Sequence, residues 1–151
     1  MTSVLIIGGG GMIGQKLALS FTENETVSLL DINFPANSDV NAHKILGSVS
    51  DSSIMEKTLS NRPDTIFYLA SVVSGEAEAN FSKGWDVNIQ AFWSFLGQIK
   101  DQYSKSDGEY KPKVIFTSSI AVFGSPFPYK ISDDFLTAPR TSYGAQKACC
   151  E

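Results

Sequence analysis

Tyr143 and Lys147 have the chemical types and the spacing that general-base catalysis requires. Residues four apart on a helix lie on one face, so the phenol and the ammonium would be neighbours. A free phenol has a pKa of about 10, and a base near neutral pH needs its phenolate stabilised by about 3 pKa units, or roughly 4 kcal/mol. The ammonium charge and the helix dipole both act in that direction. The pair predicts a tyrosine base, although amphipathic surface helices also carry this spacing.

A second group of residues, at the start of the chain, could hold phosphates. Gly9, Gly11 and Gly14 fit the fingerprint GxGxxG, and Gly8 with the same last two glycines fits the related GxxGxxG. Both need glycine for a tight turn, for close approach of the backbone to a pyrophosphate and for close helix–strand packing. The N-terminus of the following helix offers free N–H groups. The loop predicts a dinucleotide site, with a flexible glycine turn as the alternative.

An acidic residue follows the glycine loop at the distance that a dinucleotide site requires. Asp31 ends the second expected strand, 20 residues after Gly11. A carboxylate there can bond both hydroxyls of a ribose. It also repels a 2′-phosphate, so Asp31 favours NAD over NADP.

The elements that must position these residues alternate between strand and helix. Apolar runs rich in β-branched residues predict strands, and apolar residues spaced three and four apart predict helices. Strands are expected at 3–7, 26–30, 44–46, 65–70 and 114–117. Helices are expected at 11–21, up to about 59 from a cap at Asp51 or Ser52, at 76–103, and from a cap at Thr141 or Ser142. This alternation is typical of an α/β fold with a doubly wound parallel sheet, the Rossmann fold.

The composition excludes several classes of protein. With 151 residues, 42% hydrophobic and 19% charged, the chain amounts to one ordinary globular domain. Its net charge of −4 argues against a grip on nucleic-acid phosphates, and no apolar run approaches the ~18 residues of a membrane span. The single histidine, His43, and the adjacent Cys149 and Cys150 offer neither a metal cluster nor a disulfide framework. A reducing, cytoplasmic location is expected.

The chain resembles the N-terminal part of extended short-chain dehydrogenases/reductases, the NAD-dependent epimerase/dehydratase family. The resemblance lies in the order and spacing of the glycine loop, Asn88, the Ser118-Ser119 pair and Tyr143 with Lys147. The resemblance covers essentially the whole chain and implies an enzyme with NAD as its cofactor. By this resemblance, Tyr143 would take the proton of the substrate hydroxyl, Ser119 would hydrogen-bond the reacting oxygen, and Lys147 would bind the nicotinamide ribose. Asn88 would support the proton path to Lys147.

The same resemblance implies two sets of binding residues. Those for NAD are Gly8, Gly11, Met12, Ile13, Gly14, Asp31, Ser48, Leu69, Ala70, Ser71, Tyr143 and Lys147. Those for the substrate are Ser74, Glu76, Ser119 and Tyr143. Two positions depart from the family pattern: Ser48 stands where an aspartate often bonds adenine, and Tyr68 where many relatives have a histidine. Arg140 could pair with a substrate carboxylate, with a solvated surface charge as the plainer interpretation.

The substrate class rests on two segments. Residues 71–79 and 117–124 most resemble, within the family, dehydrogenases that oxidise the C2 hydroxyl of a sugar acid with NAD. A nucleotide-sugar epimerase or dehydratase shares every motif and is one alternative; a non-catalytic dinucleotide-binding sensor is another. The expected partner is therefore a small sugar acid, with no nucleic acid and no membrane.

The resemblance also bears on assembly and on completeness. A homodimer is expected through the 76–103 helix, with Phe81, Phe92 and Phe95 as candidates for its second face. The stripe from Trp85 to Trp93 is expected mostly in the core. Family members continue with further strands and a small substrate domain. We therefore expect residues 1–151 to form an NAD-binding domain that is incomplete at its C-terminus, lacks the substrate domain and is inactive alone.

Overall fold

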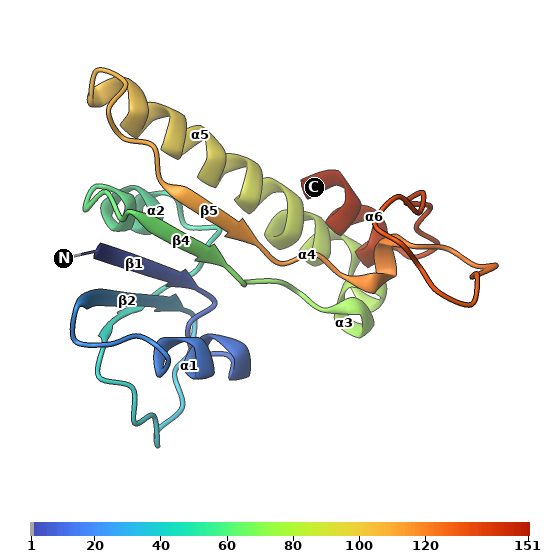
Figure 1. Cartoon of the computed structure of the whole chain (residues 1–151), viewed down its shortest axis with the longest axis horizontal. Coiled ribbons are helices and arrows are strands. Elements are labelled where there is room, and N and C mark those ends of the chain that lie inside the picture. Colours follow the sequence, from blue (N-terminus) through green and yellow to red (C-terminus); the bar gives the residue numbers. More distant parts are fainter. Residues whose placement is uncertain (1) are drawn as a thin grey trace. The chain divides into compact units, whose positions relative to one another are not determined.

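Five parallel strands form one sheet in the computed structural model, which describes residues 2–151 (Figure 1). The strands are β1 (Thr2–Ile7), β2 (Glu25–Asp31), β3 (His43–Leu46), β4 (Thr65–Tyr68) and β5 (Lys113–Phe116). Their order in the sheet is β3-β2-β1-β4-β5, so the direction in which strands are added reverses between β1 and β4. This order confirms the predicted doubly wound parallel sheet.

Helices cover both faces of the sheet. One face carries α1 (Met12–Ala18), and the other carries α2 (Ser52–Leu59) and α5 (Ala91–Lys105) (Figure 1). The central strands are apolar because both of their faces are buried: Leu5, Ile6 and Ile7 of β1 are at most 1% exposed. On the α5 side, the rings of Tyr68 and Phe95 pack with centroids 5.1 Å apart.

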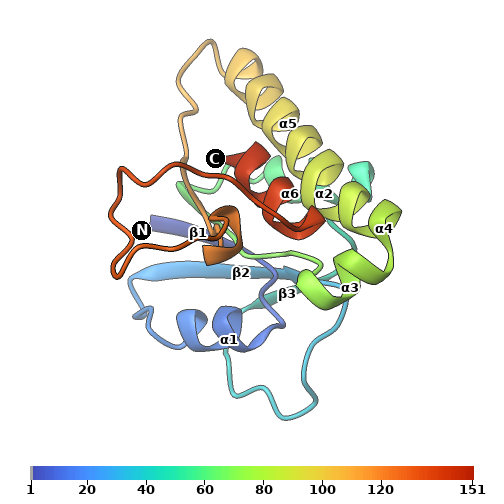
Figure 2. The ribbon, with the colours of Figure 1, turned by 90° about the vertical axis from the view of Figure 1, so that its right-hand side faces the viewer.

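The chain divides into two compact units. The first, residues up to 70 and 93–117, contains the sheet, α1, α2 and most of α5. The second, residues 71–92 and 118–151, contains α3 (Ser74–Ala79), α4 (Phe81–Trp85), the π-helical turn η1 (Asp86–Gln90), the 3-10 turn η2 (Ile120–Val122) and α6 (Ser142–Cys150). Within the second unit α6 lies against α3 and α4 (Figure 2). The first unit therefore carries the glycine loop, and the second carries the tyrosine–lysine pair.

The single helix predicted at 76–103 is wrong, because that segment is divided into α3, α4, η1 and α5. The first break falls at Asn80, whose backbone has φ −137° and ψ 86°. Its Oδ1 accepts the N–H of Lys83 at 3.0 Å. An asparagine that caps the next helix in this way competes with continued helical hydrogen bonding. The π turn that follows is of a kind often found at functional sites.

Burial corrects the expectation for four aromatic side chains. Phe92 and Phe95, expected on a dimer surface, are 6% and 1% exposed and belong to the core. Trp85 and Trp93, expected mostly in the core, are 41% and 78% exposed. Phe92 and Phe95 are three residues apart and so share one face of α5, the face on which Phe95 packs against Tyr68 of β4, whereas Trp93 lies off that face.

The other elements agree with the sequence within a few residues. Asp51 caps α2 by accepting the N–H groups of Ser53 and Ile54, as its position predicts. Thr141, one of two candidates, is the N-cap of α6. His43, predicted in a loop, begins β3 with an exposed side chain. Across residues 2–151, no helix combines the length and the apolar character that crossing a membrane demands.

Candidate functional site

The glycine loop joins β1 to α1 in a conformation that other residues would not adopt. Gly8 has φ +86°, and a Cβ there would lie 2.7 Å from the backbone nitrogen of Ala70. A Cβ on Gly14 would lie 2.4 Å from the carbonyl oxygen of Gly8. The turn and the close packing of helix on strand therefore require glycine at both positions.

Gly11 has a different reason to be glycine. Its Cβ would meet the carbonyl oxygen of Gly8 at 3.4 Å, an ordinary contact, so the fold itself has room for a side chain. Gly11 is the N-cap of α1, and no side chain caps this helix end. The first N–H groups of α1 are therefore left for an external partner. A ligand that approaches the backbone at this point explains the glycine.

A hollow of about 280 Å³ opens at this loop. It is lined by Gly8, Gly11, Met12, Ile13, Gly14, Leu69 and Thr117. The hollow lies at the carboxyl ends of β1, β4 and β5, beside the point where the strand order reverses, which is where open α/β sheets bind ligands. All but one of these residues are among those expected to bind NAD. Thr117 is the one that sequence reasoning missed, although a hydroxyl directly after a strand of this sheet is a usable signal.

Asp31 lies at the end of β2 with its carboxylate turned to the glycine loop. Its Oδ2 accepts the N–H of Gly10 at 2.8 Å, and its Oδ1 accepts the N–H of Asn33 at 3.2 Å. Each carboxylate oxygen can accept a further hydrogen bond. Asp31 is therefore placed beside the loop as a ribose-binding acid would be.

Three further residues expected to bind NAD lie near the ends of β3 and β4. Leu69 donates its N–H to the carbonyl oxygen of Ile7 at 2.8 Å, which continues the pairing of β4 with β1. Ala70 lies directly against the glycine loop. Ser48 follows β3, and its Oγ accepts the N–H of Ser50 at 3.1 Å, so its hydroxyl takes part in a local turn.

In the second unit, α6 carries Tyr143 and Lys147 on one face, as their spacing predicts. The helix begins where the Oγ1 of Thr141 accepts the N–H of Gly144 at 3.0 Å. The Nζ of Lys147 lies 5.9 Å from the centre of the Tyr143 ring. Lys147 is only 3% exposed, and burial lowers the pKa of its ammonium. The arrangement places a buried positive charge beside a half-buried phenol.

The two serines lie on a turn that packs against the start of α6. A Cβ on Gly144 would lie 2.1 Å from the carbonyl oxygen of Ala121, so η2 contacts the first turn of α6 directly. The Oγ of Ser119 accepts the N–H of Ala121 at 3.2 Å. The hydroxyl of Ser118 donates to the carboxylate of Glu151. Ser119 thus acts here as an acceptor and can still donate its proton, whereas the proton of Ser118 is already engaged.

Asn88 is 4% exposed and uses every hydrogen-bonding position of its amide. Its Oδ1 accepts the N–H of Val72 at 2.8 Å and the hydroxyl of Ser71 at 3.0 Å. Its Nδ2 donates to the carbonyl oxygen of Val72 at 2.9 Å and to the Oε1 of Gln146 at 2.7 Å. Its backbone carbonyl accepts the thiol of Cys150 at 3.2 Å. Asn88 therefore holds α6 against the segment that follows β4, and its support of a proton path to Lys147 stays a prediction.

Gln146, which accepts a hydrogen bond from Asn88, packs closely against Gly84 of α4. It is 2% exposed. A Cβ on Gly84 would lie 2.8 Å from the Nε2 of Gln146 and 3.0 Å from the Cβ of Ala77. The two helices meet this closely because position 84 has no side chain.

The residues expected to bind substrate lie on α3 and before α6. Ser74 begins α3, and Glu76 forms an exposed ion pair with Lys83. Arg140 is exposed, with its side chain beside Gly124. Sequence reasoning missed Glu78, which receives hydrogen bonds from the start of α6. No local pattern signals such a contact, because 65 residues separate the partners.

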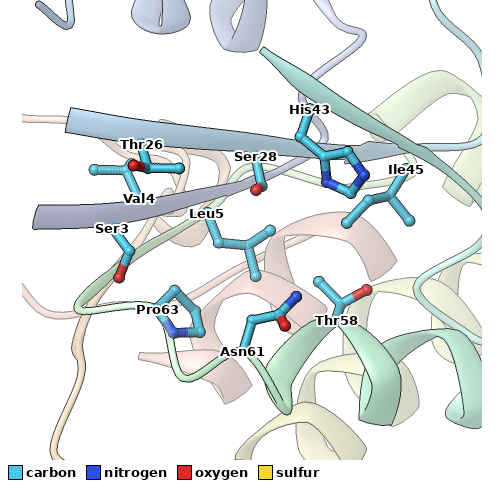
Figure 3. A pocket seen from close by; sticks show the side chains of 10 residues that line it. All are labelled: Ser3, Val4, Leu5, Thr26, Ser28, His43, Ile45, Thr58, Asn61 and Pro63. Atoms are coloured by element: carbon cyan, nitrogen blue, oxygen red, sulfur yellow. The ribbon is translucent and has the colours of Figure 1, made fainter. Parts of the chain in front are cut away.

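A second hollow, of about 340 Å³, lies at the amino-terminal ends of the strands, away from the glycine loop (Figure 3). It is lined by Ser3, Val4, Leu5, Thr26, Ser28, His43, Ile45, Thr58, Asn61 and Pro63. None of the residues expected to bind NAD or substrate lies there, and ligands of α/β sheets bind at the opposite ends of the strands. Within residues 2–151, His, Cys, Asp and Glu side chains form no group of three or more that could hold a metal ion.

Comparison with known proteins identifies relatives along nearly the whole chain. The sequence profile of the NAD dependent epimerase/dehydratase family matches residues 4–151. Two proteins named D-erythronate dehydrogenase, from Cupriavidus necator and Haemophilus influenzae, are 33% and 31% identical to this chain. The alignments cover 99% and 98% of this chain but 48% and 47% of the relatives. The chain thus spans about half the length of the curated relatives it matches.

Solved structures show the same partial coverage. The crystal structure of a nucleoside-diphosphate-sugar epimerase from Agrobacterium tumefaciens superposes with a TM-score of 0.85 at 41% sequence identity. The superposition covers 99% of this chain and 46% of the epimerase. The match therefore extends over both units of the chain but over less than half of the larger protein.

Proposed function

Because the chain belongs to the NAD dependent epimerase/dehydratase family, we propose that it is part of a dehydrogenase that oxidises the C2 hydroxyl of a sugar acid, such as D-erythronate, with NAD. The observation that carries the proposal is α6, where Tyr143 and the buried Lys147 share one face. Two relatives named D-erythronate dehydrogenase support the substrate class. In this reaction the hydroxyl proton passes to a base, and a hydride leaves C2 as the hydroxyl becomes a ketone.

The first unit fits NAD by its own features. The fold has room for a side chain at position 11, so the glycine there is explained by a ligand that a side chain would obstruct. The uncapped start of α1 leaves N–H groups for a pyrophosphate. Asp31, beside the loop, can accept the ribose hydroxyls and repels a 2′-phosphate. When bound, NAD supplies the acceptor for the hydride.

The side chains of the second unit provide the proton chemistry. Tyr143 in its phenolate form takes the proton of the substrate hydroxyl and becomes a neutral phenol, and the charge of Lys147 stabilises the phenolate before this transfer. Ser119, whose hydroxyl proton can still be donated, bonds the reacting oxygen. Asn88 contributes by holding α6 against the segment that follows β4.

Turnover by the whole protein tests this proposal. The protein is mixed with NAD and D-erythronate, and the reduced cofactor is followed by its absorbance. We expect reduction of NAD with D-erythronate and much slower reduction with NADP. Binding of NAD without any reduction of it, across a panel of four- to six-carbon sugar acids, would contradict the proposal.

A nucleotide-sugar epimerase is the second candidate, and the 41% identity to the Agrobacterium tumefaciens structure favours it. Such an enzyme would invert a sugar carbon of a substrate such as UDP-glucose without net formation of reduced cofactor. Product analysis with UDP-glucose therefore separates the two candidates. A protein that binds NAD but converts neither substrate would be a sensor.

We also propose that the whole protein forms a homodimer through the helical segment from α4 to α5. Phe81 and Trp85 of α4 stack with ring centroids 6.1 Å apart and remain 58% and 41% exposed. Trp93 of α5 is 78% exposed. Exposed aromatic side chains of this kind are typical of interfaces. Sedimentation should show a dimer that the double variant Phe81→Ser, Trp85→Ser dissociates; an unchanged mass in the variant would contradict this interface.

A further inference from the structure

Glu78 joins α3 to the first turn of the helix that carries Tyr143. Its Oε1 accepts the backbone N–H of Tyr143 at 2.9 Å and the hydroxyl of Ser142 at 2.7 Å. Both donors belong to α6, 64 and 65 residues away in the sequence. These hydrogen bonds hold the pKa of the Glu78 carboxyl below its usual range, so the group is ionised at neutral pH.

The N–H that Glu78 receives is one that α6 cannot satisfy by itself. The first N–H groups of a helix have no partner within it. Thr141, the N-cap, accepts the N–H of Gly144, and Glu78 accepts the N–H of Tyr143. A hydrogen bond from a backbone N–H to a carboxylate is stronger than one to a neutral oxygen. The backbone of Tyr143 is therefore fixed from α3 by a charged acceptor.

We propose that Glu78 is a positioning residue for Tyr143: it holds the first turn of α6 so that the phenol keeps its place. The inference rests on the proposed dehydrogenase function, in which Tyr143 is the base. Glu78 is the carboxylate of α3 that holds the backbone of Tyr143, since Glu76 is paired with Lys83.

Three variants of the whole protein separate position from charge. Glu78→Gln keeps an oxygen that can accept both hydrogen bonds but removes the charge, whereas Glu78→Ala removes both. Asp133→Asn, in the exposed loop of the same unit, is the control for loss of a carboxylate. We expect Glu78→Ala to lower kcat with D-erythronate by about 10-fold or more, since small displacements of reacting groups are costly. NAD affinity should stay nearly the same.

Glu78→Gln should recover most of the kcat, because its side-chain oxygen can still accept both hydrogen bonds. A loss confined to kcat in Glu78→Ala, together with this rescue by the conservative variant, is the result that a purely structural role would not produce. An unchanged kcat in Glu78→Ala would overturn the inference, as would a Glu78→Gln variant that is no more active than Glu78→Ala. If Glu78→Ala does not fold, Glu78→Asp decides in its place: the carboxylate on the shorter side chain should no longer reach both donors, and a Glu78→Asp variant with unchanged kcat would overturn the inference.

Hydrogen exchange of the peptide that contains Tyr143 separates this inference from the proposed function. Faster exchange in Glu78→Ala than in Glu78→Gln and Asp133→Asn supports the positioning contact even when D-erythronate is not a substrate. Equal exchange in all variants counts against Glu78, whatever the substrate is. An unmutated protein that reduces no NAD with any sugar acid contradicts only the proposed function.

Discussion

The carboxylate of Asp31 accepts the backbone N–H of Gly10 at 2.8 Å, so the acid at the end of β2 and the glycine loop after β1 form one hydrogen-bonded unit. The two parts of the dinucleotide fingerprint lie 21 residues apart in the sequence. The contact means that the acid and the phosphate loop keep a constant separation, which a ligand spanning both requires.

Asp31→Ala should weaken NAD binding by about 10-fold, or about 1.4 kcal/mol, and narrow the gap between NAD and NADP. The variant loses the acceptor for the ribose hydroxyls and the charge that repels a 2′-phosphate. Calorimetric titration with both cofactors measures this. Asp39→Ala, an exposed acid in the following loop, is the control. Equal or tighter binding of NADP by the unmutated protein would refute the assignment.

Alanine at Gly14 should mainly affect the stability of the fold, whereas alanine at Gly11 should mainly affect NAD binding. Gly14→Ala places a Cβ 2.4 Å from the Gly8 carbonyl oxygen and should destabilise the fold by about 1–3 kcal/mol. Gly11→Ala should lower stability by no more than about 1 kcal/mol, because alanine is a poorer N-cap than glycine, while weakening NAD binding by about 10-fold or more. Gly97→Ala, in α5 with nothing within 4 Å, should stabilise by about 0.5–1 kcal/mol. Urea unfolding with and without NAD tests all three, and tight NAD binding by Gly11→Ala would contradict the phosphate site.

Tyr143→Phe in the whole protein should lower kcat by about 10²–10⁴-fold and leave NAD binding nearly intact. The ring and its packing stay, and only the proton acceptor is removed. Tyr129→Phe is the matched control, because Tyr129 is 98% exposed in the loop before α6. If Tyr143→Phe keeps most of its activity, another group is the base, and Ser119 becomes the first to test.

Asn88→Ala should lower the free energy of unfolding by about 2–4 kcal/mol, since buried groups of Val72 and Gln146 lose their partner. Asn37→Ala, at an exposed loop position, should change it little. Urea denaturation of each variant gives the comparison. A loss for Asn88→Ala no larger than that of the control would mean that the network contributes nothing.

Acid should weaken the tie between the start of β1 and the turn before β4. Hydrogen bonds from the backbone and hydroxyl of Ser3 hold the pKa of Asp64 below its ordinary value of 3.8. Because the folded value is the lower one, the contribution to stability is complete above about pH 4 and is lost as pH falls through the folded value. Asp64→Asn should flatten this part of the stability curve. Identical acid slopes in both proteins would contradict the assignment.

The glycine loop, Asp31 and the face shared by Tyr143 and Lys147 could all be predicted, because each depends on residues close together in the sequence. The spacing of glycines between a strand and a helix, and a separation of four within a helix, carry their own geometry. The Asp51 cap of α2 is local in the same sense. The predicted parallel sheet follows from the alternation of elements.

The features that could not be predicted depend on competition between alternative hydrogen bonds of the backbone, or on contacts between segments that are distant in the sequence. Asn80 stands in a helical pattern, and its capping bond to Lys83 wins over continued helix. Apolar spacing does not reveal which apolar residues of α5 face the sheet: Phe92 and Phe95 are buried and Trp93 is exposed. Glu78 meets α6 through the tertiary fold alone.

The contact between Gly84 and Gln146 has an evolutionary consequence. Since a Cβ at position 84 would lie 2.8 Å from the Nε2 of Gln146, the two positions are not free to drift independently. A lineage that acquires a side chain at position 84 must either move the Gln146 amide, at the expense of its hydrogen bond with Asn88, or shorten the side chain at position 146. Among descendants of this sequence, epistasis between these two sites should be visible as paired replacements. Glycine at 84 would then persist wherever glutamine or a larger residue occupies 146.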